Sequence, residues 1–127
     1  MAAPAPQRPP RRGYVPRSDG IVWANFSPQV GHEQAGHRPA LVLSATAYNR
    51  ISGTMLCVPL TTRAKGYRFE VPIAGDPASV ALADAARSLD WRARGARWRG
   101  ARAAPAEADE VRARLRALLA GDREDES

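Results

Sequence analysis

The sequence has one cysteine, one lysine and few aromatic residues, and each shortage narrows what the protein can be. With Cys57 alone, the 127-residue chain cannot form an internal disulfide framework. This excludes a disulfide-stapled scaffold and fits a reducing compartment. No apolar run approaches the length that spans a bilayer, and the N-terminus lacks the apolar core of a signal peptide. We therefore expect a cytoplasmic protein without a membrane partner.

Lysine occurs only at Lys65, so arginine supplies every other positive side-chain charge. The net charge is +6 and the sequence pI is about 10.6. This basic balance favours a polyanionic partner such as a nucleic acid. A composition rich in arginine and alanine also follows from genome composition, so charge by itself does not locate a binding site.

The two ends of the chain differ in composition from its middle. Residues 1–13 are rich in proline, alanine and arginine, and we expect a disordered basic tail there. Residues 122–127 are mostly acidic and read as a second solvated tail. The length favours a single compact domain, which we place at residues 14–121.

Short apolar runs separated by turn signals predict a mainly β fold. The predicted strands are Ile21–Phe26, Ala40–Ala45, Thr54–Leu60, Tyr67–Ile73, Val80–Ala83 and Ser88–Trp91. Asn49–Gly53 and Ala74–Pro77 are predicted turns. Several short strands at this spacing indicate a small barrel or a half-open sheet.

One helix is predicted near the C-terminus. It can begin at Pro105, has acidic residues in its first turns, where the helix dipole favours them, and can end at Gly121. One face of this helix carries Val111, Leu115, Leu118 and Leu119. We predict that this face packs on the core.

The stretch GHEQAGHRPALVL gathers four ionisable side chains before an apolar run. His32 and Glu33 resemble the start of the zinc-protease motif His-Glu-x-x-His, but His37 falls one position too late. On a helix it would lie roughly 140° from His32, so we predict no metal site. Pro39 favours an extended backbone at Arg38, which therefore lies where a loop enters a strand. Arg38 is either a salt-bridge partner or a functional residue.

A second polar cluster follows the predicted strand TMLCVPL. It places two hydroxyls and two cations in a glycine-containing loop, at Thr61, Thr62, Arg63 and Lys65. Such a loop can bind a phosphate, or it can be a turn with capping hydroxyls.

A third stretch, residues 87–102, holds six arginines, among them Arg87, Arg92 and Arg94. It also contains Trp91 and Trp98. Indole faces between guanidinium groups suit stacked single-stranded bases. One tryptophan can instead belong to the core, and Trp91 is the better candidate.

Together these motifs closely resemble the MazF/PemK family of toxin endoribonucleases. The similar stretches include YVPRSDGIVWANFSP, EQAGHRPALVLS, CVPLTTRAKGYRFEV and SLDWRARGA, and together they span roughly Tyr14 to Ala96. The resemblance implies an α+β, mainly β fold: an SH3-like small β-barrel with short helices and a C-terminal helix. It also implies a homodimer that cuts single-stranded RNA in a sequence-selective, ribosome-independent way. A co-encoded MazE-type antitoxin, with an acidic disordered segment, would block it.

The same resemblance matches the family's catalytic arginine to Arg38, its catalytic threonine to Thr61 and its loop glutamate to Glu33. RNA carries its own nucleophile, the 2′-OH, so neither a metal nor another cofactor is required. Arg38 can stabilise charge on the phosphate, and Thr61 can hydrogen-bond a non-bridging oxygen. Glu33 is the candidate base, with His37 or His32 as alternatives. Our candidate RNA contacts are His32, His37, Thr62, Arg63, Lys65, Arg87, Arg92 and Arg94.

Two other functions compete with this interpretation. Toxins of the same fold poison DNA gyrase without cutting nucleic acid, but they resemble one another at a C-terminal Trp-Gly-Ile, whereas this chain ends GDREDES. A non-catalytic RNA-binding regulator could instead use the arginine- and tryptophan-rich stretch. Fold analogy alone does not decide between these functions.

Overall fold

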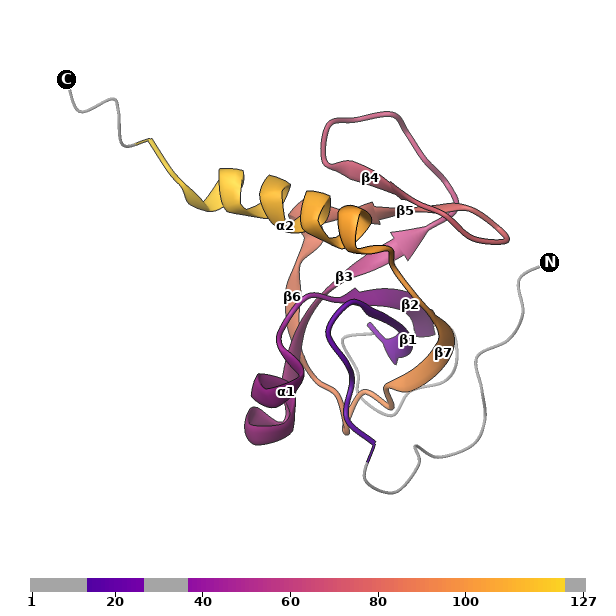
Figure 1. Ribbon diagram of the computed structural model, residues 1–127, viewed down its shortest axis with the longest axis vertical. Helices are drawn as coiled ribbons and strands as arrows, with labels where there is room; N and C mark the ends of the chain where they lie inside the picture. Colours follow the sequence, from indigo (N-terminus) through magenta and orange to yellow (C-terminus); the bar gives the residue numbers. More distant parts are fainter. Residues whose placement is uncertain (1–13, 27–36, 123–127) are drawn as a thin grey trace.

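The computed structural model describes residues 14–26 and 37–122 as a curled antiparallel sheet with two α-helices (Figure 1). The elements in chain order are β1 (Gly20–Asn25), β2 (His37–Val42), α1 (Thr46–Ser52), β3 (Thr54–Thr61), β4 (Glu70–Ile73), β5 (Ser79–Leu82), a 3-10 turn (Ala83–Ala85), β6 (Arg87–Asp90), β7 (Arg97–Arg102) and α2 (Pro105–Leu119). The mainly β half-barrel confirms the predicted fold class. No helix among the described residues is long and apolar enough to cross a membrane.

Strand β3 organises the sheet, whose order is β4-β5-β3-β2-β1-β7. It pairs with β2 along one edge. Along its other edge it pairs first with β6, from Thr54 to Cys57, and then with β5, at Leu60 and Thr61. The last two residues of β3, Leu60 and Thr61, are held by β5, while β2 pairs with β3 as far as Pro59.

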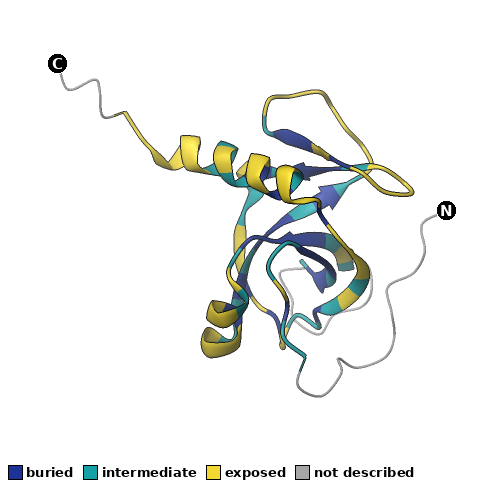
Figure 2. Ribbon diagram, viewed as in Figure 1, coloured by how far each residue is buried: buried dark blue, intermediate teal, exposed yellow. Residues whose placement is uncertain are grey.

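The central strands bury both of their faces, so alternate residues enter two different apolar clusters. We call one the α2-side cluster, since it joins the sheet to α2; it includes Ile21, Leu41, Val58, Leu60, Ala108 and Val111. The other, the Trp91 cluster, lies on the opposite face and includes Val22, Ala24, Ala40, Val42, Met55, Cys57, Leu89 and Trp91. Figure 2 shows that the buried residues concentrate in these strands. Trp91 is only 4 % exposed, which confirms its predicted place in the core, whereas Trp98 is 46 % exposed.

Helix α1 corrects the prediction of a turn at Asn49–Gly53. Only Gly53 is a turn residue; it caps the helix with a left-handed φ of 74°. Asn49 is fully buried and its side-chain amide donates a hydrogen bond to the carbonyl of Pro16, at 2.9 Å. The Trp91 indole N–H donates to the Asn49 carbonyl at 2.9 Å. These long-range bonds hold a helix that has no apolar stripe in its sequence.

The strand boundaries also differ from the prediction. β2 begins at His37 and ends at Val42, three residues before Ala45, and β4 begins at Glu70 rather than Tyr67. β7 was not predicted at all, because its sequence RWRGAR is mostly polar. It pairs with β1 as an edge strand, where only a limited apolar contribution is needed.

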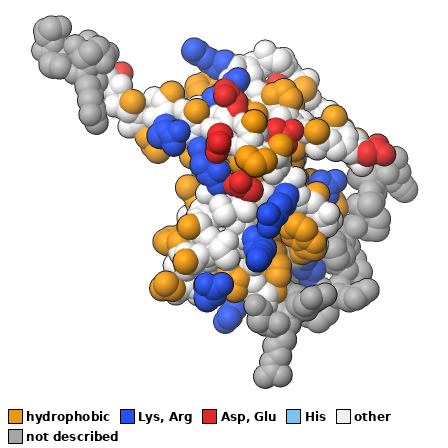
Figure 3. All heavy atoms as spheres, in the orientation of Figure 1, with side chains coloured by type: hydrophobic (Ala, Val, Ile, Leu, Met, Phe, Trp, Pro, Cys, Tyr) orange, Lys and Arg blue, Asp and Glu red, His pale blue; other side chains and the backbone are white. Residues whose placement is uncertain are grey.

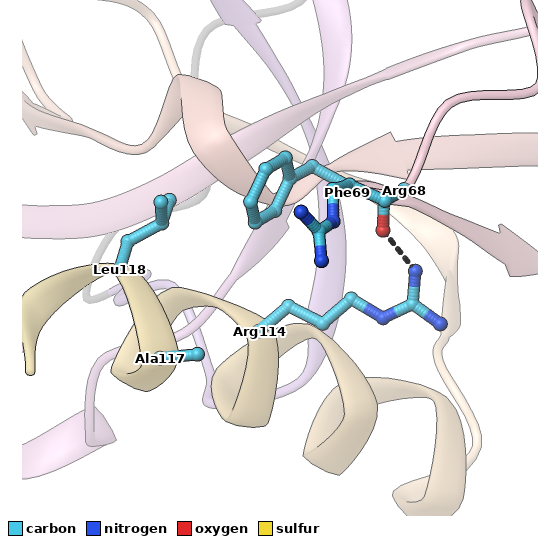
Figure 4. A pocket seen from close by; sticks show the side chains of 5 residues that line it. All are labelled: Arg68, Phe69, Arg114, Ala117 and Leu118. Atoms are coloured by element: carbon cyan, nitrogen blue, oxygen red, sulfur yellow. Dashed lines mark hydrogen bonds between the residues drawn. The ribbon is translucent and has the colours of Figure 1, made fainter.

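Helix α2 forms as predicted, but only part of its apolar face packs on the core. Val111 is buried, whereas Leu118 is 45 % exposed and Leu119 73 % exposed. The second half of the helix extends past the sheet (Figure 1). It leaves a hollow of about 580 Å³ between Leu118 and Phe69, beside which the Arg114 guanidinium donates a hydrogen bond to the Arg68 carbonyl (Figure 4). The predicted core packing is therefore wrong for the last turn.

Candidate active site

The strand register brings Arg38 and Thr61 to opposite positions. β2 and β3 pair antiparallel with Ala40 opposite Pro59. Continued by two residues, the same register places Arg38 across from Thr61. Side chains directly opposite one another project from the same face of an antiparallel sheet, and this face carries the Trp91 cluster. On this face, β2 runs from the buried Val42 to Arg38, and β3 runs from the buried Met55 to Thr61. Arg38 and Thr61 therefore lie where the buried part of each strand gives way to the surface.

Arg38 lies on the strand, as the following proline predicts, and its side chain is exposed. Across the other edge of β2 its partner is Ala24. Within residues 14–26 and 37–122, no carboxylate forms an ion pair with Arg38. An arginine on a rigid strand without an acidic partner is suited to gripping an anion from solution.

Thr61 is the half-buried last residue of β3. Its hydroxyl oxygen accepts a hydrogen bond from the backbone N–H of Arg63, at 3.1 Å. A hydroxyl that accepts in this way keeps its own hydrogen for donation. Thr61 can therefore donate to an oxygen of an anion held by Arg38.

Arg87 closes the same end of the barrel from another strand. It stands on β6 opposite Cys57, yet its guanidinium donates to the Phe26 carbonyl at 3.2 Å and lies 5.5 Å from the centre of the Phe26 ring. Burial raises the pKa of the Cys57 thiol to about 12, and the nearby charge of Arg87 acts in the opposite direction. We call Arg38, Thr61 and Arg87, with the strand ends that carry them, the barrel mouth.

The loop after β3 presents the predicted side chains of Thr62, Arg63 and Lys65 to solvent. Its backbone is held by a residue that the sequence analysis missed. The Glu70 carboxylate accepts the N–H of Lys65 at 2.8 and 3.0 Å and the N–H of Gly66 at 2.7 Å. These hydrogen bonds, that from Lys65 first, lower the pKa of Glu70, while desolvation opposes them. The only sequence signal for Glu70 was an acidic residue inside the apolar string FEVPI.

His37 lies beside Arg38, but side chains alternate along a strand, so it projects from the opposite face. It is registered with Asn25 of β1, and its Nδ1 is buried without a hydrogen-bond partner in the described part of the chain. Burial, followed by the charge of Arg97, lowers the pKa of the imidazole. Both effects favour the neutral form of His37.

The two other predicted arginines occupy different places. The Arg94 carbonyl accepts the N–H of Asn25 at 3.0 Å, which sets the β6–β7 turn beside the ends of β1 and β2. Arg92 follows Asp90, which is registered with Thr54 at the start of β3. The length of β3, roughly 20 Å, thus separates the Asp90–Thr54 pair from Thr61. Arg92 packs over the Trp91 ring at 5.1 Å and lines a hollow of about 440 Å³ next to α1.

Glu33 and His32 lie outside the described residues. Their predicted roles as base and RNA contact therefore remain predictions. On the face seen in Figure 3, acidic side chains gather in the upper part, near α2 and the β4–β5 hairpin. In the lower part, over the barrel strands, the charged side chains drawn for the described residues are basic.

A curled half-barrel whose open end carries two arginines and a hydroxyl defines a small basic β-barrel protein with a cationic mouth. Comparison with known proteins narrows this class. Residues 17–119 match the sequence profile of the PemK-like, MazF-like toxins of type II toxin–antitoxin systems, and the chain belongs to that family.

Several relatives align over most of their length. The Escherichia coli K12 endoribonuclease toxin MazF is 49 % identical over 107 residues, which cover 84 % of this chain and 96 % of the relative. The endoribonuclease toxin ChpB of the same strain is 40 % identical over 106 residues, covering 78 % of this chain and 90 % of ChpB. A crystal structure of MazF from Deinococcus radiodurans superposes with a TM-score of 0.75 at 51 % identity, covering 84 % of this chain and 98 % of that one.

Proposed function

We propose that this chain is the toxin of a type II toxin–antitoxin system and that it cuts single-stranded RNA in the cytoplasm. It acts in a sequence-selective way, without the ribosome and without a metal ion. The observation that carries the proposal is the antiparallel register of β2 and β3, which, continued by two residues from Ala40 and Pro59, sets Arg38 across from Thr61 on one face. Arg87 reaches the same end of the sheet at the Phe26 carbonyl. The endoribonuclease activity of the relatives named above supports it.

The residue types fit a reaction in which RNA supplies the nucleophile. The 2′-oxygen attacks the adjacent phosphorus, and the bond from phosphorus to the 5′-oxygen breaks. A base takes the proton of the 2′-OH, and the leaving oxygen is protonated from water. The products are a 2′,3′-cyclic phosphate and a free 5′-OH.

Arg38 and Thr61 act on the charge that develops at the phosphate. The planar guanidinium of Arg38 can hold two phosphate oxygens and stays charged throughout, so it serves as an electrostatic stabiliser rather than an acid. The Thr61 hydroxyl donates to a non-bridging oxygen. Since His37 projects from the other face of β2, Glu33 is the stronger candidate base.

The remaining predicted contacts divide by position. Arg87, Arg94, Thr62, Arg63 and Lys65 lie around the barrel mouth or in the segments that border it, and we propose that they bind nucleotides next to the scissile bond. Arg92 lies beside α1 and contacts RNA that passes along this side of the barrel. His32 and His37 are assigned to binding rather than proton transfer.

An RNA oligonucleotide with a single 2′-deoxy sugar at the scissile position tests the mechanism. The protein should bind it normally and fail to cut it, while EDTA should leave cleavage of the all-ribose substrate unchanged. Cleavage of the deoxy substrate, or dependence on a divalent ion, contradicts the mechanism. A gyrase poison or a non-catalytic RNA-binding protein would leave naked RNA intact.

We also propose a homodimer and an antitoxin with an acidic segment that competes with RNA for the barrel mouth. MazE–MazF complexes of the Deinococcus radiodurans relatives support an antitoxin partner; one of these toxin chains is 46 % identical, with a TM-score of 0.73. Sedimentation equilibrium should give twice the 13.7 kDa mass of the chain. A monomer that cuts RNA would contradict the dimer.

A further inference from the structure

Glu70 is an unusual acid in this fold because it is 8 % exposed and is held mainly by backbone groups. One of its carboxylate oxygens accepts the N–H groups of both Lys65 and Gly66, and the other accepts Lys65 again. The N–H of Glu70 itself donates to the Tyr67 carbonyl at 3.0 Å. A carboxylate filling a ring of backbone N–H groups is an internal counterpart of the anion-binding nest.

The loop that Glu70 holds has few other attachments. The side chains of Thr62, Arg63 and Lys65 are exposed, so they add no packing. At its end, the Tyr67 hydroxyl donates to Asp84 at 2.7 Å. At its start, the Arg63 N–H donates to the Thr61 hydroxyl oxygen. In the part of the chain that the structure describes, Glu70 is the only carboxylate that binds the backbone between these two ends.

We infer that Glu70 is a positioning residue for RNA cleavage. It fixes the backbone at Lys65 and Gly66, which fixes the N–H of Arg63 and hence the direction in which the Thr61 hydroxyl donates. It touches neither the substrate nor the reacting atoms. This inference rests on the proposed function, because it assigns to Glu70 the geometry of a site that cuts RNA.

Replacement of Glu70 by alanine should lower kcat with little change in KM. The loop keeps its cations, so RNA still binds, but Thr61 loses its orientation. Because Glu70 acts through the Thr61 hydroxyl, the loss expected for Glu70→Ala is at most that of removing this hydroxyl, about tenfold in rate. Glu70→Gln keeps one acceptor oxygen and should lose less.

Glu107 provides a matched control within the same chain. Its carboxylate also accepts two backbone N–H groups, those of Ala74 and Ala104, both at 2.8 Å, but it does so at the start of α2. Glu107→Ala should lower the melting temperature about as much as Glu70→Ala and leave kcat unchanged. Equal losses of kcat in both variants would mean that only stability is affected, and would overturn the inference.

Added acetate supplies a readout that a purely structural role would not move. The cavity left by Glu70→Ala exposes two N–H groups that a small carboxylate can fill. Sodium acetate should raise kcat of Glu70→Ala toward the wild-type value, whereas sodium chloride at the same ionic strength should not. If acetate has no effect and Glu70→Gln restores nothing, the inference is wrong.

Gly66→Ala keeps the question answerable if Glu70→Ala does not fold. Gly66 has a φ of 83°, and a methyl group there would meet no atom within 4 Å, so the substitution strains the loop without a clash. It should reproduce the loss of kcat while Glu70 remains in place. Wild-type protein that leaves RNA uncut contradicts the proposed function itself. If the wild-type protein cuts RNA and both Gly66→Ala and Glu70→Gln cut it equally fast, the proposed function stands and only the role of Glu70 is overturned.

Discussion

Arginines occur both at the barrel mouth and beside α2, but their surroundings differ. Arg112 donates to Asp19 at 2.6 Å and to the Leu43 carbonyl at 2.9 Å, which ties α2 to the sheet. Arg114 pairs with Glu110 at 2.7 Å. At the mouth, Arg38 has no carboxylate partner among the described residues, and Arg87 contacts an aromatic ring and a carbonyl. The α2 arginines hold the fold together, whereas those at the mouth leave their charge available for a ligand.

Replacing one arginine of each group by alanine, Arg38 at the barrel mouth and Arg112 on α2, tests the difference between the two groups most directly. Arg38→Ala should lower the cleavage rate by on the order of 10²–10³ without changing the melting temperature, because it removes charge stabilisation only. Arg38→Lys should recover little of that rate, since an ammonium group cannot reproduce the guanidinium fork. Single-turnover cleavage and thermal unfolding measure the two quantities.

Arg112→Ala should show the reverse pattern. It leaves the Leu43 carbonyl and Asp19 without their donor, so it should lower the free energy of unfolding by about 2 kcal/mol. The rate of RNA cleavage by the folded fraction should stay unchanged. A loss of rate in Arg112→Ala without a loss of stability would break the comparison.

Within α2, the two ends of the apolar face should respond differently. Val111→Ala removes buried methyl groups and should cost about 2 kcal/mol in the free energy of unfolding. Leu119→Ala, at an exposed position, should change it by less than about 0.5 kcal/mol. Denaturant unfolding measures both, and a large effect at Leu119 in the isolated protein would show that this end is covered in solution.

Thr61→Val should lower the rate by about tenfold, because one neutral hydrogen bond to the phosphate is lost while the side-chain shape is kept. Thr61→Ser keeps the hydroxyl and should remain close to wild type. RNA affinity should hardly change in either variant. A Thr61→Val enzyme as fast as the wild type would remove the hydroxyl from the mechanism.

The smallest expected effect is a dependence of stability on pH through Glu70. The backbone N–H groups, that of Lys65 first, lower the pKa of Glu70 in the folded protein below its ordinary value. Glu70 therefore stabilises the fold above its unfolded pKa and loses this contribution as the pH falls through the folded value. Melting temperatures of wild type and Glu70→Gln should therefore converge only at acidic pH. A difference that instead grew as the pH fell would reverse the sign and contradict the hydrogen-bonding arrangement.

The sequence predicted elements that leave a repeated pattern of residues. It did not predict features that depend on a single tertiary contact. Short apolar runs bounded by turn signals predicted β1, β3 and β5, and these runs are apolar because the central strands bury residues on both faces. The resemblance to a toxin family pointed to Arg38 and Thr61, and the register of β2 and β3, continued by two residues, places them opposite one another. Glu70 was missed because a carboxylate bound to backbone N–H groups leaves no periodic signal.

Helix α2 illustrates a different limit. Its 3.6-residue period identified the apolar face correctly, but periodicity cannot tell where the underlying sheet ends. Leu118 and Leu119 therefore looked like core residues although the helix has passed the last strand. Similarly, β7 depends on an edge position beside β1, which no residue within RWRGAR announces.

The position of Arg38, exposed and outside both apolar clusters, has a genetic consequence. If Arg38 acts as proposed, a missense allele at this codon should yield a folded toxin that cuts RNA far more slowly, while the other cations of the barrel mouth can still hold an acidic antitoxin segment. In a cell that also carries the intact gene, the inert product sequesters antitoxin and releases active toxin. Such an allele is harmless in a cell without the intact gene and toxic in a cell that carries it. An allele that destroys the core is recessive, because its product does not fold and binds no antitoxin.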